Sequence, residues 1–313
     1  TLKGQAFELS GAVVYQSEAI SSDNLLIKLG DNEITMNGQM TASEVDLVAS
    51  IHATELSLLS SSLQGQVVGE LKLSGQYQQP SIELNLQVSE FKQQNNHIEQ
   101  LTVSSQGVWA SDLTTEINLS KALINGFVID EAQLNQTGWL DQHQLSFTMT
   151  TPDLMTTGNL SGGLFNAQKA PVSTLADLGA GNGWQGQLSQ HQLTLETKET
   201  IELQSPVEIV FDQRLQIEQA CWLGVSAGTL CINLEDIAGT EAFSGAISLT
   251  AFNVLVFKTM LPQGLEITGL ADGQADFSWL PDNLIIDGRL ALNGGQIKTV
   301  GVSKNEYQAD IET

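Results

Sequence analysis

Two cysteines are the residues of this 313-residue chain whose type and spacing first suggest chemistry. Cys221 and Cys231 flank a short stretch in which Gly224 and Gly228 can form a turn, so a hairpin would place the two thiols opposite each other. A disulfide here would close a small loop, contribute about 2–3 kcal/mol to stability and indicate an oxidising compartment. The alternative is a pair of buried free thiols. We favour the disulfide, and the CxxC spacing of metal sites is absent from the sequence.

The histidines and the common catalytic motifs do not predict an active site. Four histidines, each more than 40 residues from the next, have no partner at metal-ligand spacing and are expected on the surface or in loops: His52, His97, His143 and His191. The sequence contains no GxSxG elbow, no HExxH motif, no phosphate-binding GxxxxGK and no GxGxxG that opens a helix. We therefore expect neither a bound metal nor a cofactor.

Short polar turns offer a few oxygen-bearing side chains, and turn chemistry explains them. Ser161 precedes two glycines but has no assignable general base, and the acidic stretches 30–33 and 272–276 do not match the EF-hand spacing for calcium. Paired carboxylates could serve a glycoside hydrolase on a β-solenoid. However, aromatic residues make up only 6% of the chain and arginine is nearly missing. The sequence therefore predicts a protein that is not an enzyme.

The charge balance excludes several classes of partner. The formal net charge is −24, and the only arginines are Arg214 and Arg289. A protein that binds nucleic acid needs clustered lysine and arginine, so we expect no nucleic-acid partner. Adsorption to an anionic membrane surface is disfavoured for the same reason. The acidic residues are best explained by solubility, because they keep a strand-rich surface from aggregating.

Apolar and polar residues alternate along much of the chain, which is the pattern of half-buried β-strands. Residues 82–88 show it most clearly, because Glu83, Asn85 and Gln87 separate the apolar positions. Each such strand has one apolar and one polar face, and the ordinary role of the apolar face is a protein core. The alternation alone favours a core over a ligand-binding surface. The family resemblance described below changes this balance, and on its strength we predict that cleanly alternating positions line a lipid-binding groove: Leu71, Leu73, Ile82, Leu84, Leu86, Val207, Ile209, Phe211, Leu284, Ile286 and Leu290.

The many amphipathic strands have few helices to cover them. The spacing of apolar residues predicts at most two short helices, over 252–260 and 171–177, and an Ala-, Gly- and Pro-rich stretch at 167–183 is the one predicted joint. A sandwich, a closed barrel and a long folded sheet all satisfy this pattern. The uniform texture of residues 1–313 favours one elongated, all-β segment: a long curved sheet folded lengthwise into a taco-like apolar trough. At ~4.8 Å per strand, it would run about 100 Å.

The stretch between Trp184 and Trp279 carries a family resemblance. It opens with the W-x-G-x-L-S pattern of 184–189, continues with the Cys-Trp-Leu of 221–223 and the Leu-Cys of 230–231, and closes with the G-x-x-x-G-x-A-D run of 269–276 before Trp279. In this order the motifs resemble the middle-to-late periplasmic part of the TamB family, the inner-membrane-anchored subunits of the translocation and assembly module of Gram-negative bacteria. These motifs cover about a third of the chain. The remainder resembles the family only in its alternating, strand-like sequence pattern, which the wider AsmA-like group shares.

The resemblance implies a location, a partner and a function. Proteins of this family are anchored in the inner membrane, cross the periplasm and work with a TamA-like outer-membrane barrel protein. Their sheet is thought to form a trough lined with apolar side chains, and the Cys221–Cys231 pair fits the family's structural disulfide. The membrane anchor is not in this sequence, and we expect the partner-binding region beyond Thr313, so the chain is interpreted as a fragment of a longer polypeptide.

Three functional hypotheses follow from the pattern and the resemblance. The first is a conduit that carries phospholipid acyl chains across the periplasm and so supports outer-membrane biogenesis. The second is a scaffold or chaperone whose sheet edges bind strands of outer-membrane proteins and autotransporters during assembly. The third is a secreted β-solenoid enzyme or adhesin. We favour the conduit mainly because of the family resemblance. A conduit needs an inner face without charged residues, and the apolar positions of residues 82–88 and 207–211 satisfy this condition.

Overall fold

The structure is a computed structural model that describes residues 4–16, 18–109, 111–124, 126–172, 182–195, 199–212, 215–237, 242–255, 265–280 and 283–299. Within these ranges it contains 19 strands, assigned to a single antiparallel sheet, and a short 3₁₀ helix, η1 (Leu56–Leu58); residues 254–255 also have 3₁₀ conformation. The all-β prediction is therefore confirmed. The chain divides into two compact units, which we call the N-terminal unit (Thr1–Leu193 and Glu208–Gln213) and the C-terminal unit (Thr194–Val207 and Arg214–Thr313).

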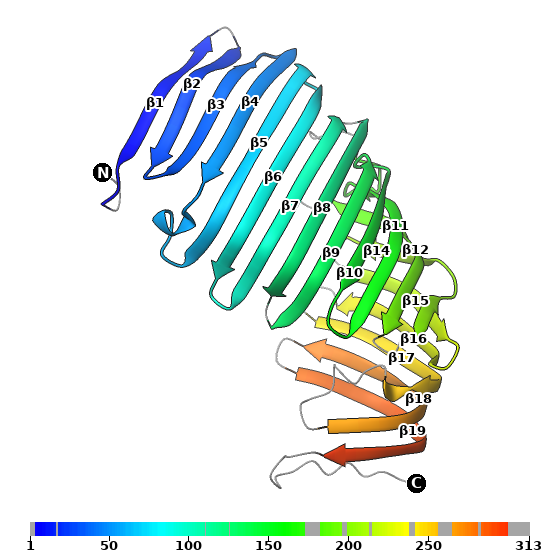
Figure 1. Cartoon of the computed structure of the whole chain (residues 1–313). Coiled ribbons are helices and arrows are strands. Elements are labelled where there is room, and N and C mark those ends of the chain that lie inside the picture. The colour runs from blue at the N-terminus through cyan, green and yellow to red at the C-terminus, as the bar shows by residue number, and fades with distance from the viewer. Residues whose placement is uncertain are drawn as a thin grey trace. The chain divides into compact units, whose positions relative to one another are not determined.

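The strands of the N-terminal unit follow one another in sequence order, as Figure 1 shows for the blue to green part of the chain. They are β1 (Phe7–Gln16), β2 (Ala19–Leu29), β3 (Asn32–Met40), β4 (Glu44–Ala53), β5 (Leu63–Gln76), β6 (Gln79–Gln93), β7 (Asn96–Val108), β8 (Asp112–Ile124), β9 (Phe127–Gly138), β10 (His143–Thr150), β11 (Leu154–Phe165) and most of β12 (Gly183–Leu195) and β14 (Val207–Phe211). From β1 to β11 each strand pairs antiparallel with the next.

The C-terminal unit repeats this arrangement with fewer strands. It holds β13 (Thr200–Leu203), β15 (Leu215–Gly224), β16 (Gly228–Ile237), β17 (Ala242–Asn253), β18 (Leu265–Leu280) and β19 (Asn283–Thr299). Strands β15 to β19 pair antiparallel in sequence order, and β13 pairs with β15. Both units are therefore built mainly as meanders, in which strands adjacent in sequence are neighbours in the sheet.

Local sequence explains where these strands begin and end. Gly30 and Asp31 form the turn between β2 and β3, and Gly30 has a φ of +60°, a left-handed conformation that glycine adopts without steric cost. The side chain of Asn32, the next residue, bonds both backbone groups of Glu55: its Nδ2 donates to the carbonyl oxygen at 2.7 Å, and its Oδ1 accepts from the amide at 2.9 Å. This pair holds η1 against the end of the sheet.

The predicted helix over 252–260 is wrong at its start. Phe252 and Asn253 end strand β17, and the fully buried Phe252 pairs with Ala271 after a bulge that follows Leu249. The bulge shifts the alternation by one residue, which in the sequence resembles the start of a helical repeat. Residues 256–260 lie outside the described ranges. So do 173–177 of the second predicted helix and 173–181 of the predicted joint.

None of the helical structure in the described ranges is long and apolar enough to span a membrane.

Candidate functional site

Strand register assembles one continuous apolar face in the N-terminal unit. Directly paired residues of neighbouring strands lie on the same face of a sheet. A continuous series of directly paired residues contains one residue from each strand from β1 to β11. We call this series the central row: Leu9, Ile27, Ile34, Ile51, Gly69, Leu86, Val103, Ile117, Leu134, Phe147 and Gly158. At ~4.8 Å per step the row is about 48 Å long.

Further rows run beside the central row on the same face. One contains Ala53, Val67, Val88, Leu101, Leu119, Ala132 and Met149; on the other side lie Ala49, Leu71, Leu84, Ser105, Thr115, Gln136 and Leu145, and then Leu47, Leu73, Ile82, Gly107 and Leu113. Six residues separate Val67 from Leu73 on β5, so the face is about 20 Å wide. We call these four rows the apolar face. None of their members is Asp, Glu, Lys or Arg.

The structure brings together five of the predicted lining residues. Leu71 pairs with Leu84 and Leu73 with Ile82 across β5 and β6, and Leu86 lies two residues further along β6 on the same face. Ile82 is 8% exposed, whereas Leu71, Leu73, Leu84 and Leu86 are half-buried. Cross-strand neighbours cover the flanks of these side chains, and their outer ends remain accessible.

The side chains in the middle of the apolar face remain partly accessible in the described part of the structure. The close backbone contacts of strands β1 to β11 join neighbours within the sheet, and η1 contacts β5 near one end. Val103, Ile117 and Leu134, which lie on three successive strands, are all half-buried. In a two-layer fold, residues at the centre of such a sheet would be buried completely. The described part of this unit therefore presents its apolar side chains instead of packing them.

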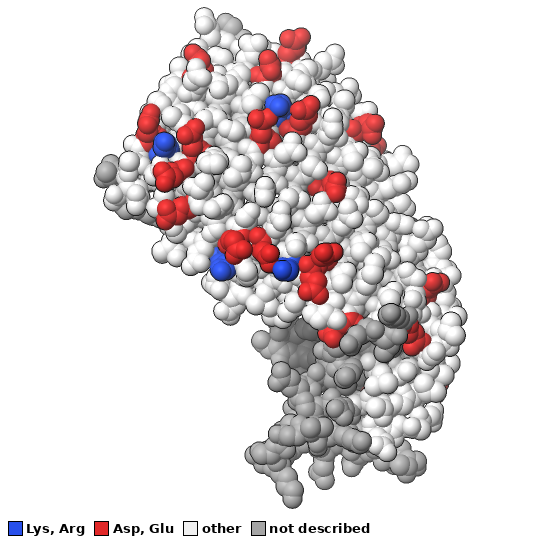
Figure 2. All heavy atoms as spheres, in the orientation of Figure 1, with Lys and Arg blue, Asp and Glu red and all other residues white. Residues whose placement is uncertain are grey.

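Charged side chains lie on the opposite face. Lys72 is flanked by Glu70 at 2.6 Å and Glu83 at 3.9 Å, and the hydrogen bond that the Lys72 ammonium donates to Glu70 raises the pKa of Lys72 above its ordinary value. In Figure 2 the visible lysines likewise lie beside carboxylates. Every lysine with a described side chain in this unit has such a partner within 4.0 Å. A free cationic patch that could bind polyanions is thus not present in the described part of the unit.

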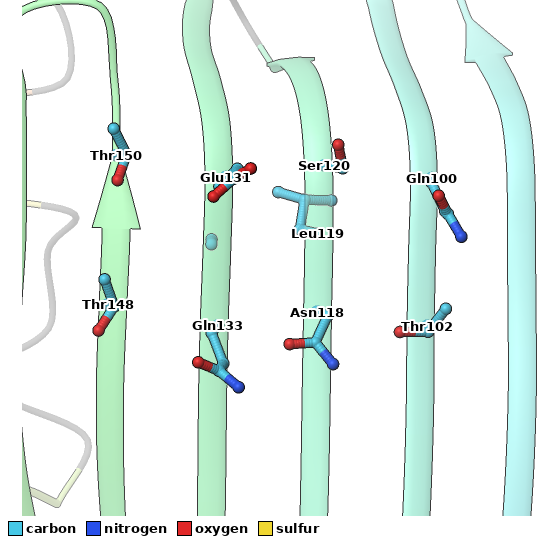
Figure 3. A pocket seen from close by; sticks show the side chains of 10 residues that line it. Gln100, Thr102, Asn118, Leu119, Ser120, Glu131, Gln133, Thr148 and Thr150 are labelled. Carbon is cyan, nitrogen blue, oxygen red and sulfur yellow. The ribbon is translucent and has the colours of Figure 1, made fainter.

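A shallow depression on the polar face does not suit an apolar ligand. Figure 3 shows its lining on β7 to β10: the side chains are mainly amides, hydroxyls and one carboxylate, including Gln100, Asn118, Glu131, Gln133 and Thr148. These residues fall between the positions of the apolar face in the alternation. The polar depression is the ordinary solvated surface of a one-sided sheet.

An aromatic cluster stands at one end of strands β7, β9, β10 and β12. The rings of Trp109 and Trp139 meet edge-on with centroids 4.6 Å apart. The ring of His143 links Trp139 to Trp184: its Nδ1 lies 3.0 Å from the Trp139 carbonyl oxygen, and its Nε2 accepts the indole N–H of Trp184 at 2.8 Å. Because an indole N–H can only donate, Nε2 must carry a lone pair, and Nδ1–H therefore donates to the carbonyl. We call these four residues the Trp cluster.

The C-terminal unit has an apolar face of its own. Its rows are Ala220, Ile232, Ile247, Ala275 and Gly288; Trp222, Leu230, Leu249, Gly273 and Leu290; and Ile217, Leu234, Gly245, Phe277 and Ile286. Of the predicted lining residues here, Ile286 and Leu290 are 61% and 57% exposed on the last described strand. The backbone of Leu284 belongs to β19, but its side chain lies outside the described set.

The predicted lining residues of β14 do not join these rows in the described pairings. Val207 is 3% exposed, Ile209 is half-buried and Phe211 is 52% exposed. The exposure of the three residues therefore differs along one short strand, and their role in a groove stays a prediction.

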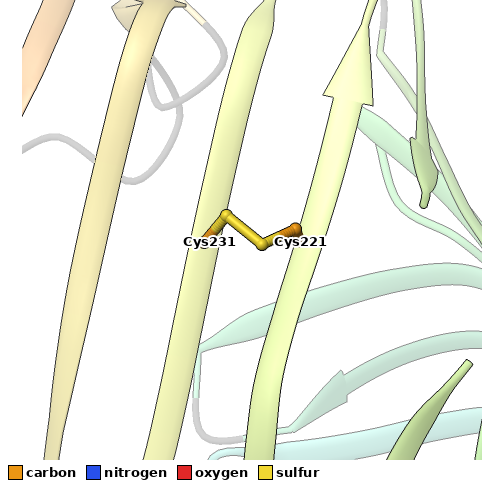
Figure 4. The surroundings of a disulfide bond; sticks show 2 residues. All are labelled: Cys221 and Cys231. Carbon is orange, nitrogen blue, oxygen red and sulfur yellow. A yellow bond between two sulfur atoms is a disulfide. The ribbon is translucent and has the colours of Figure 1, made fainter. Parts of the chain in front are cut away.

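The disulfide lies on the polar face of the C-terminal unit. Cys221 and Cys231 are direct partners across β15 and β16, with Cα atoms 4.0 Å apart, and their sulfur atoms are bonded (Figure 4). Their neighbours Ala220 and Ile232 belong to the apolar face, so the bond crosses the other side of the sheet. It ties two strands together without occupying the apolar face.

Sequence reasoning missed part of the site. Leu101 and Val103 on β7, and Ile117 and Leu119 on β8, alternate as cleanly as the residues that were chosen, and this signal could have identified them. The Trp cluster has no such signal. Its members are spread over residues 109–184, and only the register of four strands brings them together.

A long antiparallel sheet with one continuous, accessible apolar face defines a class of extended β-proteins that present a surface to apolar ligands or partners. The chain belongs to the TamB family: a family model described as TamB, N-terminal domain, matches residues 1–313, the whole chain. The matched domain is the N-terminal one, not the middle-to-late part that the sequence motifs suggested. No solved structure matches the chain. Family membership and the sheet together fit a periplasmic transport or assembly role in a module whose TamB subunit works with TamA-like partners.

Proposed function

We propose that the apolar face of the N-terminal unit binds phospholipid acyl chains and serves intermembrane lipid transport across the periplasm, in support of outer-membrane biogenesis. One observation carries this proposal: the central row is continuous over β1 to β11 and half-buried or exposed at its apolar side chains. An acyl chain is a ligand that such a long, uncharged and open surface can accept at any point.

The energetics suit transport better than storage. Each methylene that leaves water for an apolar surface contributes about 0.8 kcal/mol when fully buried. On an open face only part of that contribution is gained, and neighbouring positions such as Leu86, Val103 and Ile117 offer nearly equal side chains. Burial of its acyl chains would therefore keep a lipid from dissociating into water. Because no position has a much lower free energy than its neighbours, the lipid could still move between adjacent strands.

The disulfide and the family membership support a periplasmic location for this function. The disulfide is consistent with an oxidising compartment such as the periplasm. We propose that the complete protein is anchored in the inner membrane, that it engages a TamA-like outer-membrane barrel protein through regions beyond this chain, and that the chain has no catalytic role. The lengthwise folding of the sheet into a trough is part of this proposal.

A second candidate function is a scaffold that assembles outer-membrane proteins and autotransporters. Its sheet edges would bind their strands by β-augmentation. We favour the lipid conduit because augmentation at an edge gives no role to the long apolar face.

Lipid co-purification tests the conduit directly. Val103→Glu in the full-length protein places a carboxylate in the middle of the central row, and Ser104→Glu places the same group on the opposite face as a matched control. We expect the protein carrying Glu at 103 to lose most of the phospholipid that purifies with the wild type, and the control to retain it. Equal lipid content in both variants, with both folded, would overturn the proposal.

A further inference from the structure

One end of the apolar face differs from the rest in polarity. On strands β7, β8 and β9 the row beside the central row becomes polar, because Ser105, Thr115 and Gln136 pair across the three strands. We call these three residues the polar rung. On either side of them the same row is apolar, with Leu84 on β6 and Leu145 on β10. The polar rung is therefore a local feature of an otherwise apolar face.

Hydrogen bonds hold the polar rung in place. The hydroxyls of Ser105 and Thr115 lie 3.0 Å apart, and Ser105 is only 9% exposed. Gln136 donates from Nε2 to the carbonyl oxygen of Gly138 at 2.8 Å. Each hydroxyl still has a lone pair or hydrogen for a ligand, because a hydroxyl can donate once and accept twice. Thr115 and Gln136 are half-buried, so the rung offers neutral hydrogen-bonding groups to the apolar face mainly through these two side chains, with Ser105 beneath them in the hydrogen-bonded pair.

The Trp cluster lies beyond the polar rung at the same end of the strands. Along β7 the order is Leu101, Val103, Ser105, Gly107 and then Trp109, so polarity changes from apolar to hydroxyl to indole in one direction. Indole rings favour the boundary between hydrocarbon and water, where an apolar body and a polar N–H are both satisfied. The change in polarity therefore runs along the direction of strand β7. In the perpendicular direction, from strand to strand, the central row stays apolar.

The lengths along β7 match one acyl layer. Half of a bilayer's hydrocarbon core is about 15 Å thick. Leu101 lies four positions from Ser105 along β7, or about 13 Å, which is close to that thickness. An amphipathic molecule with its ester groups at Ser105 would therefore have its chains over Val103 and Leu101.

We infer that strands β7 to β9 hold a phospholipid with its long axis along the strands, its ester region at the polar rung and its head group at the Trp cluster. This orientation rests on the proposed lipid-binding function and adds to it the place and direction of the polar end. Lipids that move across the strands would then keep their head groups at this one end. The absence of charged residues from the rung favours recognition of the neutral ester and glycerol region, which phospholipids share.

Two photoreactive phosphatidylcholines, one with a diazirine in the head group and one with it near an acyl methyl end, test the inference on the full-length protein. We expect head-group adducts at Trp109 and Trp184, which are half-buried, and chain-end adducts at Leu101. Equal labelling of both ends by both probes would overturn the orientation and leave lipid binding intact. Labelling of the apolar face by neither probe would overturn both the orientation and the proposed function.

A paired variant makes the test specific to the rung. In Ser105→Ala/Thr115→Val the shape is kept and two hydroxyls are lost, so the ratio of head-group to chain-end labelling at Trp109 should fall by about 2–10-fold, as for a lost hydrogen bond. The control Ser104→Ala/Thr114→Val removes equivalent groups from the opposite face and should leave the ratio unchanged. An unchanged ratio in the rung variant, with fold and lipid content retained, would also overturn the inference.

Discussion

The openness of the apolar face can be tested by placing a charge on it. Leu86 lies in the central row, flanked by Gly69 and Val103 on the neighbouring strands, and is half-buried. In Leu86→Glu the carboxylate replaces an apolar side chain whose outer end already contacts solvent. The loss is then the partial transfer term of one leucine, about 1–2 kcal/mol, since the charge can remain hydrated at the surface. In a closed core the same charge would be buried without a partner, at a cost of about 3–5 kcal/mol or more.

Urea unfolding of the purified chain, followed by circular dichroism, measures the difference. Gln87→Glu is the matched control, because Gln87 is the next residue on the polar face and is exposed. We expect the control to lie within about 0.5 kcal/mol of the wild type, as surface substitutions do. The m-value, the slope of the unfolding free energy against urea concentration, should be unchanged in both variants. An unchanged m-value would show that the substitutions do not alter how much surface unfolding exposes.

A loss above about 4 kcal/mol in Leu86→Glu, or failure of that variant alone to fold, would refute the reasoning. It would mean that Leu86 is covered in solution and that the apolar face is a core. Phe252→Ala gives an internal standard, because Phe252 is fully buried and its truncation should cost about 3–5 kcal/mol. Phe252→Ala should therefore lower the free energy of unfolding clearly more than Leu86→Glu does.

Three further predictions address other parts of the structure. Removing the disulfide in Cys221→Ser/Cys231→Ser should lower the free energy of unfolding by about 2–3 kcal/mol, and dithiothreitol should shift the urea midpoint of the wild type but not of the variant. Desolvation lowers the pKa of His191 below its ordinary value of 6.5, so the folded state binds the proton more weakly than the unfolded state. The stability that the neutral imidazole contributes should be complete above pH 6.5 and should decline as the pH falls below it. In thermal unfolding between pH 5 and 8, His191→Gln should show a weaker decline than the wild type. An equal decline would mean that another group causes the pH dependence. Val14→Lys on β1 places a charge on the polar face, in the row that continues through Ser21, Gln39 and Asp46, so co-purifying lipid should be unchanged; a large loss of outer-membrane protein assembly with normal lipid content would favour the scaffold function.

Much of the fold follows from the alternation of residue types. Residues 82–88 predict a one-sided strand, and β6 has this form, with Glu83 and Asn85 exposed and Leu84 half-buried. The turn at Gly30 was predictable for a similar reason, because glycine at a positive φ is a local preference. Such features depend on neighbours in sequence, which is why sequence reasoning finds them.

Features that depend on register could not be predicted in the same way. The row that joins Leu86, Val103 and Ile117 exists only because three strands pair in one register, and a shift by one residue would move Val103 to the other face. The bond between Trp184 and His143 spans 41 residues of sequence and depends on the order of several strands. The bulge before Phe252 changed the local period, and it produced the error at residues 252–253.

The central claim is that lipid occupies the apolar face in the cell. The most direct measurement places a benzophenone amino acid at Leu86, and separately at its polar-face neighbour Gln87, in the full-length protein of living cells. Phospholipid captured at Leu86 and not at Gln87 is the result that the account predicts. No lipid at either position, or adducts at Leu86 that contain only protein, would contradict it.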